Sequence, residues 1–365
     1  MKRHNRLKKH TLGLAAALLV TAGMSQIALA GDSVYVNTSS LRYRTSAQIK
    51  DNNIEGNLSY GQKLERVGTS GQWTMILLNG KKYYVSSAYV TSKKPASAGA
   101  VQTTSQTAAG AQTSGGTEIA LSSNYKYANY SKINSGTATL YRSTASNKKN
   151  KVVCVNAGHG TNGGGSVKTQ CHPDGTAKVT GGTTGAGATS AVAVSTGMTF
   201  SDGTAESKVT LAMAKVLKDK LLAAGYDVLM IRDGEDVQLD NIARSVIANN
   251  AADCHIALHW DSTTSNKGAF YMSVPDVASY KNMEPVKSHW QQHNALGASL
   301  VEGLKSAGVK IFSGGSMAMD LTQTSYSTVP SVDIELGDKA SDHSQSTLNQ
   351  LGDGLVAGVK AYFGQ

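Results

Sequence analysis

The carboxy-terminal part of the chain alternates short apolar runs with segments of helical periodicity, and this alternation restricts the possible folds more than any other feature. The strand-like runs lie at residues 152–156, 226–231, 254–259, 269–274 and 332–335. Amphipathic helices are predicted near residues 205–224, 239–247, 285–307 and 348–363, where apolar side chains recur every three or four positions. Strands joined through helices run parallel and are covered on both faces. The sequence therefore predicts an α/β domain over residues 151–365, with a mostly parallel sheet and helices on both faces.

The first part of the chain has a different pattern, with short alternating runs and no helical period. Residues 31–93 contain five such runs, and Asn79-Gly80 between two of them is typical of a tight hairpin. This pattern predicts a small all-β barrel. Residues 94–125 are rich in Ser, Thr, Ala and Gly and are interpreted as a flexible linker, and residues 126–150 as a lead-in segment to the α/β domain.

Residues 1–30 have the features of an export signal. A basic stretch is followed by an apolar run from Leu12 to Val20 and by Ala28-Leu29-Ala30, the small-x-small pattern that signal peptidase cuts. The apolar run is shorter than the ~20 residues that span a bilayer, so cleavage near Ala30 is favoured over a retained anchor. We therefore expect a mature secreted protein without a membrane span.

Charge and cysteine content exclude two further classes of protein. Half of the formal charge of +10 comes from Lys and Arg in the first 30 residues, so we expect no nucleic-acid partner. The cysteines are Cys154, Cys171 and Cys254, an odd number scattered over a chain that is large enough to bury a core. A disulfide-stabilised scaffold is therefore not expected, and Cys154 and Cys254, which lie in apolar runs, should be buried.

Four polar residues lie at what should be one edge of the predicted sheet. His159 follows the strand at 152–156, Glu206 is in the first turn of the next helix, and His259 and Glu335 end the strands at 254–259 and 332–335. The carboxyl ends of parallel strands and the N-termini of the helices that follow share an edge, so these side chains should converge. Each residue alone also fits an ordinary structural explanation: a turn, a charge that complements a helix dipole, or a buried core histidine.

Two imidazoles and one carboxylate match a catalytic zinc site, in which three protein ligands leave the fourth position for water. We therefore predict that His159, Glu206 and His259 bind one Zn²⁺ ion. The helix N-terminus favours the ionised form of Glu206, which is the form that binds a cation. Glu335 is then predicted to take a proton from the water and to pass it to a leaving amine.

Motifs in a defined order surround these residues. They are NAGHG at 156–160, Glu206 at the start of a helix, Arg244 before Ala248-Asn249, ALH at 257–259, and VDIELG at 332–337 after Pro330. In this order and spacing, residues from about 150 to 365 resemble the zinc-dependent N-acetylmuramoyl-L-alanine amidases of the type 3 family. The resemblance implies hydrolysis of the amide between the lactyl group of N-acetylmuramic acid and the L-alanine of the stem peptide.

The resemblance also implies roles for individual residues. His159, Glu206 and His259 would be the zinc ligands, and Glu335 the catalytic acid/base. Three further residues, all near these motifs, are candidates for substrate contacts: Asp261, Arg244 and His343.

The region before the linker is similar to the bacterial SH3-like domain of cell-wall proteins. The similarity rests on the run Leu41 to Arg44, on Gly71-Gln72-Trp73, and on the glycine and tyrosine spacing up to Val90. It implies binding to wall polymer or stem peptide through aromatic side chains, for which the candidates are Tyr43, Trp73, Tyr84 and Tyr89. The alternative is that these aromatic residues belong to the barrel core, and for Trp73 we favour that interpretation.

The sequence departs from the amidase pattern at several places. Asn156 stands where Asp is usual, Trp260-Asp261 follows His259 where a small residue and Asn are usual, and residues 160–203 replace a short loop. We predict that residues 160–203 form a flap or rim over the cleft. His289 and His293 have the spacing of a zinc-binding helix but lack its Glu, so we expect surface residues there.

The sequence as a whole predicts a secreted, wall-associated, monomeric peptidoglycan amidase with a wall-binding module. Its expected partner is peptidoglycan, and anionic wall polymers are candidates for a second. Two alternatives remain open at this point: a zinc peptidase or deacetylase acting on the same polymer, and a catalytically silent wall-binding protein.

Overall fold

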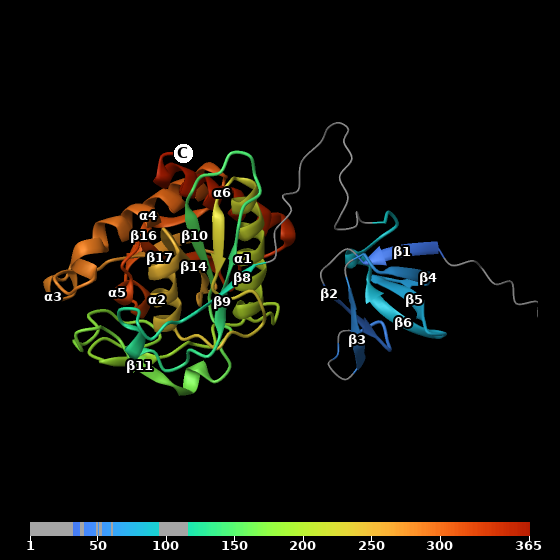
Figure 1. Ribbon diagram of the computed structural model, residues 1–365, viewed down its shortest axis with the longest axis horizontal. Coiled ribbons are helices and arrows are strands. Elements are labelled where there is room, and N and C mark those ends of the chain that lie inside the picture. Colours follow the sequence, from blue (N-terminus) through green and yellow to red (C-terminus); the bar gives the residue numbers. More distant parts are fainter. Residues whose placement is uncertain (1–31, 37–39, 49, 51–52, 60, 95–115) are drawn as a thin grey trace, which may run out of the picture. The chain divides into compact units, whose positions relative to one another are not determined.

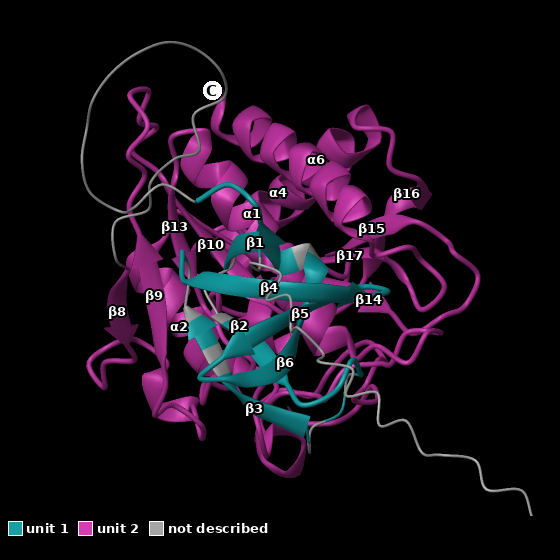
Figure 2. Cartoon of the chain, turned by 90° about the vertical axis from the view of Figure 1, so that its right-hand side faces the viewer, with its two compact units in different colours: residues 1–106 teal, residues 107–365 magenta. Residues whose placement is uncertain are grey.

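The computed structural model describes residues 32–94, except 37–39, 49, 51–52 and 60, and residues 116–365. The described chain forms two compact units, one within residues 1–106 and the other within residues 107–365 (Figure 2). The predicted signal peptide and most of the predicted linker lie outside the described residues. Across the described ranges, no helix is both long enough and apolar enough to cross a membrane.

The first unit is all-β, as predicted. Its strands are β1 (Asp32–Val36), β2 (Ser40–Arg44), β3 (Ile54–Ser59), β4 (Lys63–Ser70), β5 (Trp73–Leu78), β6 (Lys81–Ser86) and β7 (Val90–Thr91). They form one antiparallel sheet in the order β3-β2-β6-β5-β4-β1-β7. Asn79 and Gly80 both have positive φ, 51° and 75°, as a two-residue hairpin turn between β5 and β6 requires. Alternating side chains fill the core, namely Val34, Val36, Leu41, Leu58, Leu64, Ile76 and Val85.

The second unit is built on an eight-stranded sheet (Figure 1). Its strands are β8 (Thr117–Ala120), β9 (Thr137–Tyr141), β10 (Val152–Ala157), β13 (Asp227–Met230), β14 (Cys254–Asp261), β15 (Ala269–Ser273), β16 (Ile311–Ala318) and β17 (Ser331–Asp338). In the order β16-β15-β17-β14-β10-β13-β9-β8, the central strands β17, β14, β10 and β13 run parallel, whereas β15 is antiparallel to β17 and β9 to β13. The predicted α/β class is therefore confirmed.

Helices cover both faces of this sheet. They are α1 (Glu206–Ala223), α2 (Asn241–Ala251), α3 (Ala278–Lys281), α4 (Val286–Ser306), α5 (Thr322–Tyr326) and α6 (Gln345–Phe363). The helices α1, α4 and α6 pack on one core, which receives Val153 and Val155 of β10, and α2 packs on another, which receives Cys154. Because side chains alternate along a strand, one short apolar run supplies both cores.

Segments before the predicted α/β domain extend the sheet at one edge. β8 lies inside the range predicted as linker and β9 inside the predicted lead-in segment, and the two strands pair in antiparallel register before β9 pairs with β13. Backbone hydrogen bonds hold such an edge hairpin, so it does not need the long apolar run by which a central strand is recognised. Ile119 packs against the core and Ala138 and Leu140 belong to it, so three apolar side chains are enough to attach this hairpin.

Candidate metal centre and catalytic cleft

The four residues predicted to converge lie at the carboxyl edge of the parallel strands. His159 is two residues beyond β10, and Glu206 is the first residue of α1. His259 of β14 and Glu335 of β17 are direct partners in the parallel register. All four side chains line one cleft with a volume of about 500 Å³.

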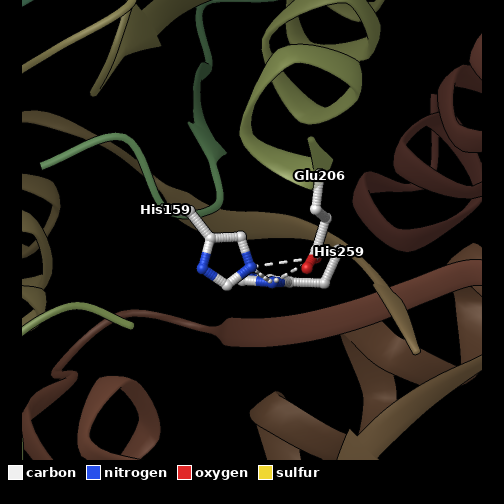
Figure 3. Close-up of side chains that lie close together, drawn as sticks. All are labelled: His159, Glu206 and His259. Carbon is white, nitrogen blue, oxygen red and sulfur yellow. Dashed lines mark hydrogen bonds and ion pairs between the residues drawn. The ribbon is translucent and has the colours of Figure 1, made fainter. Parts of the chain in front are cut away.

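Three of these side chains bring one ligand atom each to a common point (Figure 3). His159 Nε2 lies 2.9 Å from Glu206 Oε1, and His259 Nδ1 lies 3.1 Å from that nitrogen and 3.2 Å from that oxygen. Tetrahedral zinc with bonds of ~2.0–2.1 Å separates its ligand atoms by roughly 3.3 Å. The donor set and its spacing therefore fit a zinc ion without rearrangement of the backbone.

Hydrogen bonds from neighbouring backbone groups orient the first two ligands. His159 Nδ1 donates to the carbonyl oxygen of Ser195 at 2.9 Å, which leaves the Nε2 lone pair free to face the other ligands. Glu206 accepts the N–H of Met198 on Oε2 at 2.9 Å and the N–H of Trp260 on Oε1 at 3.0 Å. Burial opposes ionisation of Glu206, but the hydrogen bonds to the two histidines outweigh it and lower the pKa of the carboxyl group.

Two glycines make room for the ligand side chains. A Cβ on Gly158 would lie 2.3 Å from His259 Cε1, so the imidazole ring packs directly on the backbone of residue 158. Gly197 has φ +81°, and a Cβ there would lie 2.8 Å from His159 Cδ2 and 2.9 Å from Glu206 Oε2. The ligands can approach one another only because these positions carry no side chain.

Two buried arginines hold the loop that carries His159. Arg244 donates to the His159 carbonyl and to Thr161 Oγ1, both at 2.8 Å, and to Asn156 Oδ1 at 3.0 Å. Arg232 donates to the carbonyl of Gly158 at 2.9 Å and is also buried. Arg244, predicted to contact substrate, is buried in the lining of the cleft and uses its guanidinium N–H groups within the protein, and the substrate contact stays a prediction. Arg232 lies two residues beyond β13 and was given no role by the sequence.

Glu335 stands beside the three ligands together with a second carboxylate that the sequence analysis did not identify. Asp333 is two residues earlier on β17, so both side chains face the cleft, and Asp333 Oδ2 lies 3.6 Å from His259 Nε2. Burial, and then the charge of Asp333, raises the pKa of Glu335 to about 8. Burial also raises the pKa of Asp333. Burial alone would lower the pKa of His259, but the charges of Asp333 and Glu206 raise it to about 10.

The long segment 160–203, predicted as a flap or rim over the cleft, lines one side of the cleft and forms a wall of it. Its cleft-lining residues are 178, 181–184, 191–192 and 194–198. Apart from β11 (Lys168–Gln170), β12 (Ser190–Val192) and a short 3₁₀ turn at Gly164–Ser166, it has no regular secondary structure (Figure 1).

The buried carboxylate of Asp320 anchors this wall. It accepts from the N–H groups of Val179 at 2.7 Å and Thr180 at 3.0 Å, and it lies 3.0 Å from both His172 Nε2 and Lys178 Nζ. Burial opposes ionisation of Asp320, but the hydrogen bonds from His172, Thr180 and the N–H of Val179 outweigh burial and lower the pKa of this carboxyl group. A carboxylate with this many donors anchors residues 172–180 of the segment.

The remaining predicted substrate contacts differ in position. Asp261 lines the cleft and forms an ion pair with Lys267. His343 lies outside the cleft lining: its ring packs 4.4 Å from the ring of Phe200, and its Nε2 lies 3.3 Å from Asp202. The prediction for His343 rested on nearness to Glu335 in sequence, and the turn after β17 carries it away from the cleft.

The aromatic candidates of the first unit retain exposed surface. The ring of Tyr43 packs edge-on against that of Tyr83 at 4.9 Å, Tyr84 is half-buried, and Tyr89 is 50% exposed. Trp73 is also half-buried and lies outside the buried core cluster, so the preference for a core role was wrong. It is the first residue of β5, in which the buried positions are Thr74 and Ile76.

His255 and His293, two described histidines outside the metal centre, are buried. His293 was predicted at the surface but is 2% exposed, and its Nδ1 accepts the N–H of Ser331 at 2.9 Å, because this face of α4 packs on β17. His255 is buried and its Nε2 accepts from Asn156 Nδ2 at 3.1 Å. The prediction that Cys154 and Cys254 are buried is confirmed, and both are free thiols.

The comparison with protein families gives one match. A family model described as N-acetylmuramoyl-L-alanine amidase matches residues 153–359. Among curated proteins, none matches the chain.

Several solved structures are similar to the chain. The N-acetylmuramyl-L-alanine amidase Ami1 from Mycobacterium smegmatis has a TM-score of 0.46 and 18% identity, covering 60% of this chain and 99% of that chain. The N-acetylmuramoyl-L-alanine amidase AmiC2 of Nostoc punctiforme has a TM-score of 0.42 and 16% identity, covering 60% and 99%. An N-acetylmuramoyl-L-alanine amidase from Clostridium difficile 630 has a TM-score of 0.41 and 16% identity, covering 59% and 97%.

Proposed function

The chain belongs to the N-acetylmuramoyl-L-alanine amidase family, whose model covers more than half of its length, and from this premise we propose a zinc-dependent mechanism for it. Its activity is the hydrolysis of the amide bond between N-acetylmuramic acid and L-alanine in peptidoglycan. The proposal concerns which residues bind the ion, which residue transfers the proton, and how the enzyme reaches its substrate.

In the proposed site His159 and His259 bind zinc with one imidazole nitrogen each, and Glu206 binds it with a carboxylate oxygen. The observation that carries this proposal is the mutual distance of 2.9 to 3.2 Å between the three donor atoms, beside the buried carboxyl group of Glu335. A bound zinc ion would polarise the scissile carbonyl group and lower the pKa of water toward ~7.

Glu335 is proposed as the general acid and base. A carboxyl pKa raised by burial suits a group that alternates between accepting a proton from water and donating it to the departing amine of L-alanine. Residues between 178 and 198 line one side of the cleft, and the carbonyl of Ser195 keeps Nε2 of His159 directed at the site.

We also propose export and wall attachment. The basic, apolar and small-residue pattern of residues 1–30 supports a signal peptide that is cleaved near Ala30. The all-β unit is proposed as an SH3-like module that binds peptidoglycan or anionic wall polymers through Tyr43, Trp73, Tyr84 and Tyr89. A tether after it would raise the concentration of a monomeric catalytic domain at the wall.

Digestion of purified sacculi tests the reaction and the role of Glu335 together. The zinc-loaded wild type should release new L-alanine amino termini and leave stem peptides intact, and both chelation and Glu335→Gln should abolish this release. Glu302→Gln is the matched control, because Glu302 is an exposed residue of α4. Its one ion pair in the described chain is a long contact with Lys305, at 3.7 Å. Release at the wild-type rate by Glu335→Gln would contradict the assigned role.

The products also separate the alternatives. Cleavage within stem peptides would indicate a peptidase, and loss of acetyl groups would indicate a deacetylase. Unaltered peptidoglycan after prolonged incubation with the zinc-loaded protein would indicate a wall-binding protein without activity.

A further inference from the structure

The outward atom of each proposed zinc ligand has a partner, and one of these partners is a charged side chain. Backbone groups of Ser195, Met198 and Trp260 hold His159 and Glu206. The outward nitrogen of His259, Nε2, instead faces the carboxylate of Asp333 at 3.6 Å. This is an ion-pair contact, slightly longer than a hydrogen bond.

The position of Asp333 follows from the register of the sheet. His259 of β14 pairs with Glu335 of β17, and Ala257 pairs with Asp333. Because side chains alternate along a strand, Asp333 and Glu335 lie on the same side of β17, and Asp333 reaches the imidazole ring from the side opposite the other two ligands.

The surroundings of Asp333 do not explain it as a structural residue. It lies between the buried apolar residues Val332 and Ile334, and its Oδ1 is buried without a hydrogen-bond partner in the described part of the chain. An unpaired buried carboxylate oxygen costs free energy. A carboxylate at this place is explained if its charge acts on the neighbouring imidazole.

Asp333 does not belong to the ligand set itself. The donor atoms that lie within 4.8 Å of one another come from His159, Glu206 and His259. Asp333 contacts the nitrogen of His259 that is not part of this set. The geometry therefore gives Asp333 an orienting role and not a coordinating one.

We propose that Asp333 is a positioning residue of the metal centre, which accepts the Nε2 proton of His259 and so holds Nδ1 toward His159 and Glu206. A carboxylate in this position fixes the tautomer and the ring orientation of the histidine and increases its basicity as a ligand. The inference rests on the proposed function in that the ion is taken to be zinc.

Metal affinity of the full chain tests this role directly. The zinc dissociation constant of wild type, Asp333→Asn and Asp333→Ala is measured by competition with a chromophoric chelator. Loss of a partner that orients a ligand typically weakens metal binding 10–100-fold. We expect a loss in this range for Asp333→Ala and a smaller loss for Asp333→Asn, because the amide oxygen keeps an acceptor beside Nε2 while the charge is removed.

Two further measurements separate positioning from a general effect on folding. Urea unfolding of the chelated proteins should show a loss of stability smaller than the loss of zinc-binding free energy, because each variant loses the ion pair with His259 but also removes a buried carboxylate oxygen that has no hydrogen-bond partner. The visible absorption of the cobalt-loaded protein should change in both variants, because the orientation of an imidazole ligand changes. Asp253→Asn is the matched control, because the Asp253 carboxylate pairs with Lys151 at 2.8 Å at the other end of β14. The zinc affinity of this variant should equal that of the wild type.

The possible outcomes decide the matter. Wild-type zinc affinity in both Asp333 variants would overturn the inference and leave the proposed function intact. Reduced affinity accompanied by an equal loss of stability in the chelated protein would also overturn it, since Asp333 would then be structural. Failure of the wild type to bind zinc at all would overturn the proposed function and the inference with it.

Discussion

Replacement of Gly158 by alanine should remove His259 from the metal centre without unfolding the protein. The added Cβ would lie 2.3, 2.5 and 2.7 Å from Cε1, Nε2 and Nδ1 of the His259 ring. Ordinary carbon contacts are at 3.4 Å or more, so the ring must move by about 1 Å, whereas ligand distances at a zinc site vary by only ~0.2 Å.

The backbone cannot absorb this displacement. The N–H of Gly158 donates to the carbonyl of Leu258 at 3.1 Å, and Arg232 holds the carbonyl of Gly158 at 2.9 Å. Loss of a partner that only orients a ligand weakens metal binding by up to ~100-fold. Displacement of the ligand itself should cost more, so we expect zinc affinity to fall by more than ~100-fold. Crowding of this kind costs ~1–3 kcal/mol of stability, which leaves the fold intact.

Chelator competition for the zinc dissociation constant and urea unfolding of the chelated protein measure the two effects. Gly165→Ala is the matched control, because a Cβ there would have only Thr196 Cγ2 within reach, at 3.9 Å. The reasoning is refuted if Gly158→Ala is folded and binds zinc within twofold of the wild type, since the ring would then tolerate the added methyl group.

Three other substitutions test contacts elsewhere in the second unit. Arg244→Met leaves several buried carbonyl groups without donors and should lower the free energy of unfolding of the chelated protein by at least ~3 kcal/mol in urea; a loss below ~1 kcal/mol would contradict this. Burial lowers the pKa of His293 from 6.5 to about 3, so its stability contribution is present above pH 6.5 and is lost as the pH falls toward 3. His293→Gln should therefore make the acid-side slope of the unfolding free energy shallower by ~1.4 kcal/mol per pH unit, and an unchanged slope would count against the argument. Asp320→Asn weakens charge-assisted hydrogen bonds, so hydrogen exchange at the amides of Val179 and Thr180 should rise at least ~10-fold while α1 is unaffected; equal protection would show that the wall is held otherwise.

The placement of the central site could be predicted because one rule of topology applies to it. Parallel strands end at one edge, and His159, His259 and Glu335 each come from the end of an apolar run that is readable in the sequence. Glu206 follows from the start of an amphipathic helix. Residue type and strand order were sufficient, and no detail of side-chain packing was needed.

The failures occurred where packing decides the position of a side chain. His293 lies three residues before Leu296 and seven before Leu300, on the apolar stripe of α4, but its polarity and its spacing from His289 suggested the surface. Asp333 is hidden within a run that reads as an ordinary buried strand, and only the register with β14 brings it to His259. Arg244 is the opposite case. It is a conspicuous charge within a motif, but its guanidinium group donates hydrogen bonds to backbone carbonyls.

Residues 160–203 show most clearly what the sequence does not contain. The segment has no periodicity, yet its backbone at Ser195 and Met198 orients two of the proposed ligands, and Gly197 is packed against both of them. Backbone donors and acceptors in an irregular loop carry no signature in side-chain type. The position of this backbone depends in turn on its anchors, and the strongest of them, Asp320, is more than 100 residues away in the sequence. We therefore expect the loop to couple the metal centre to this distant carboxylate, so a change at Asp320 should weaken zinc binding, measured by chelator competition, as well as loosen the wall of the cleft.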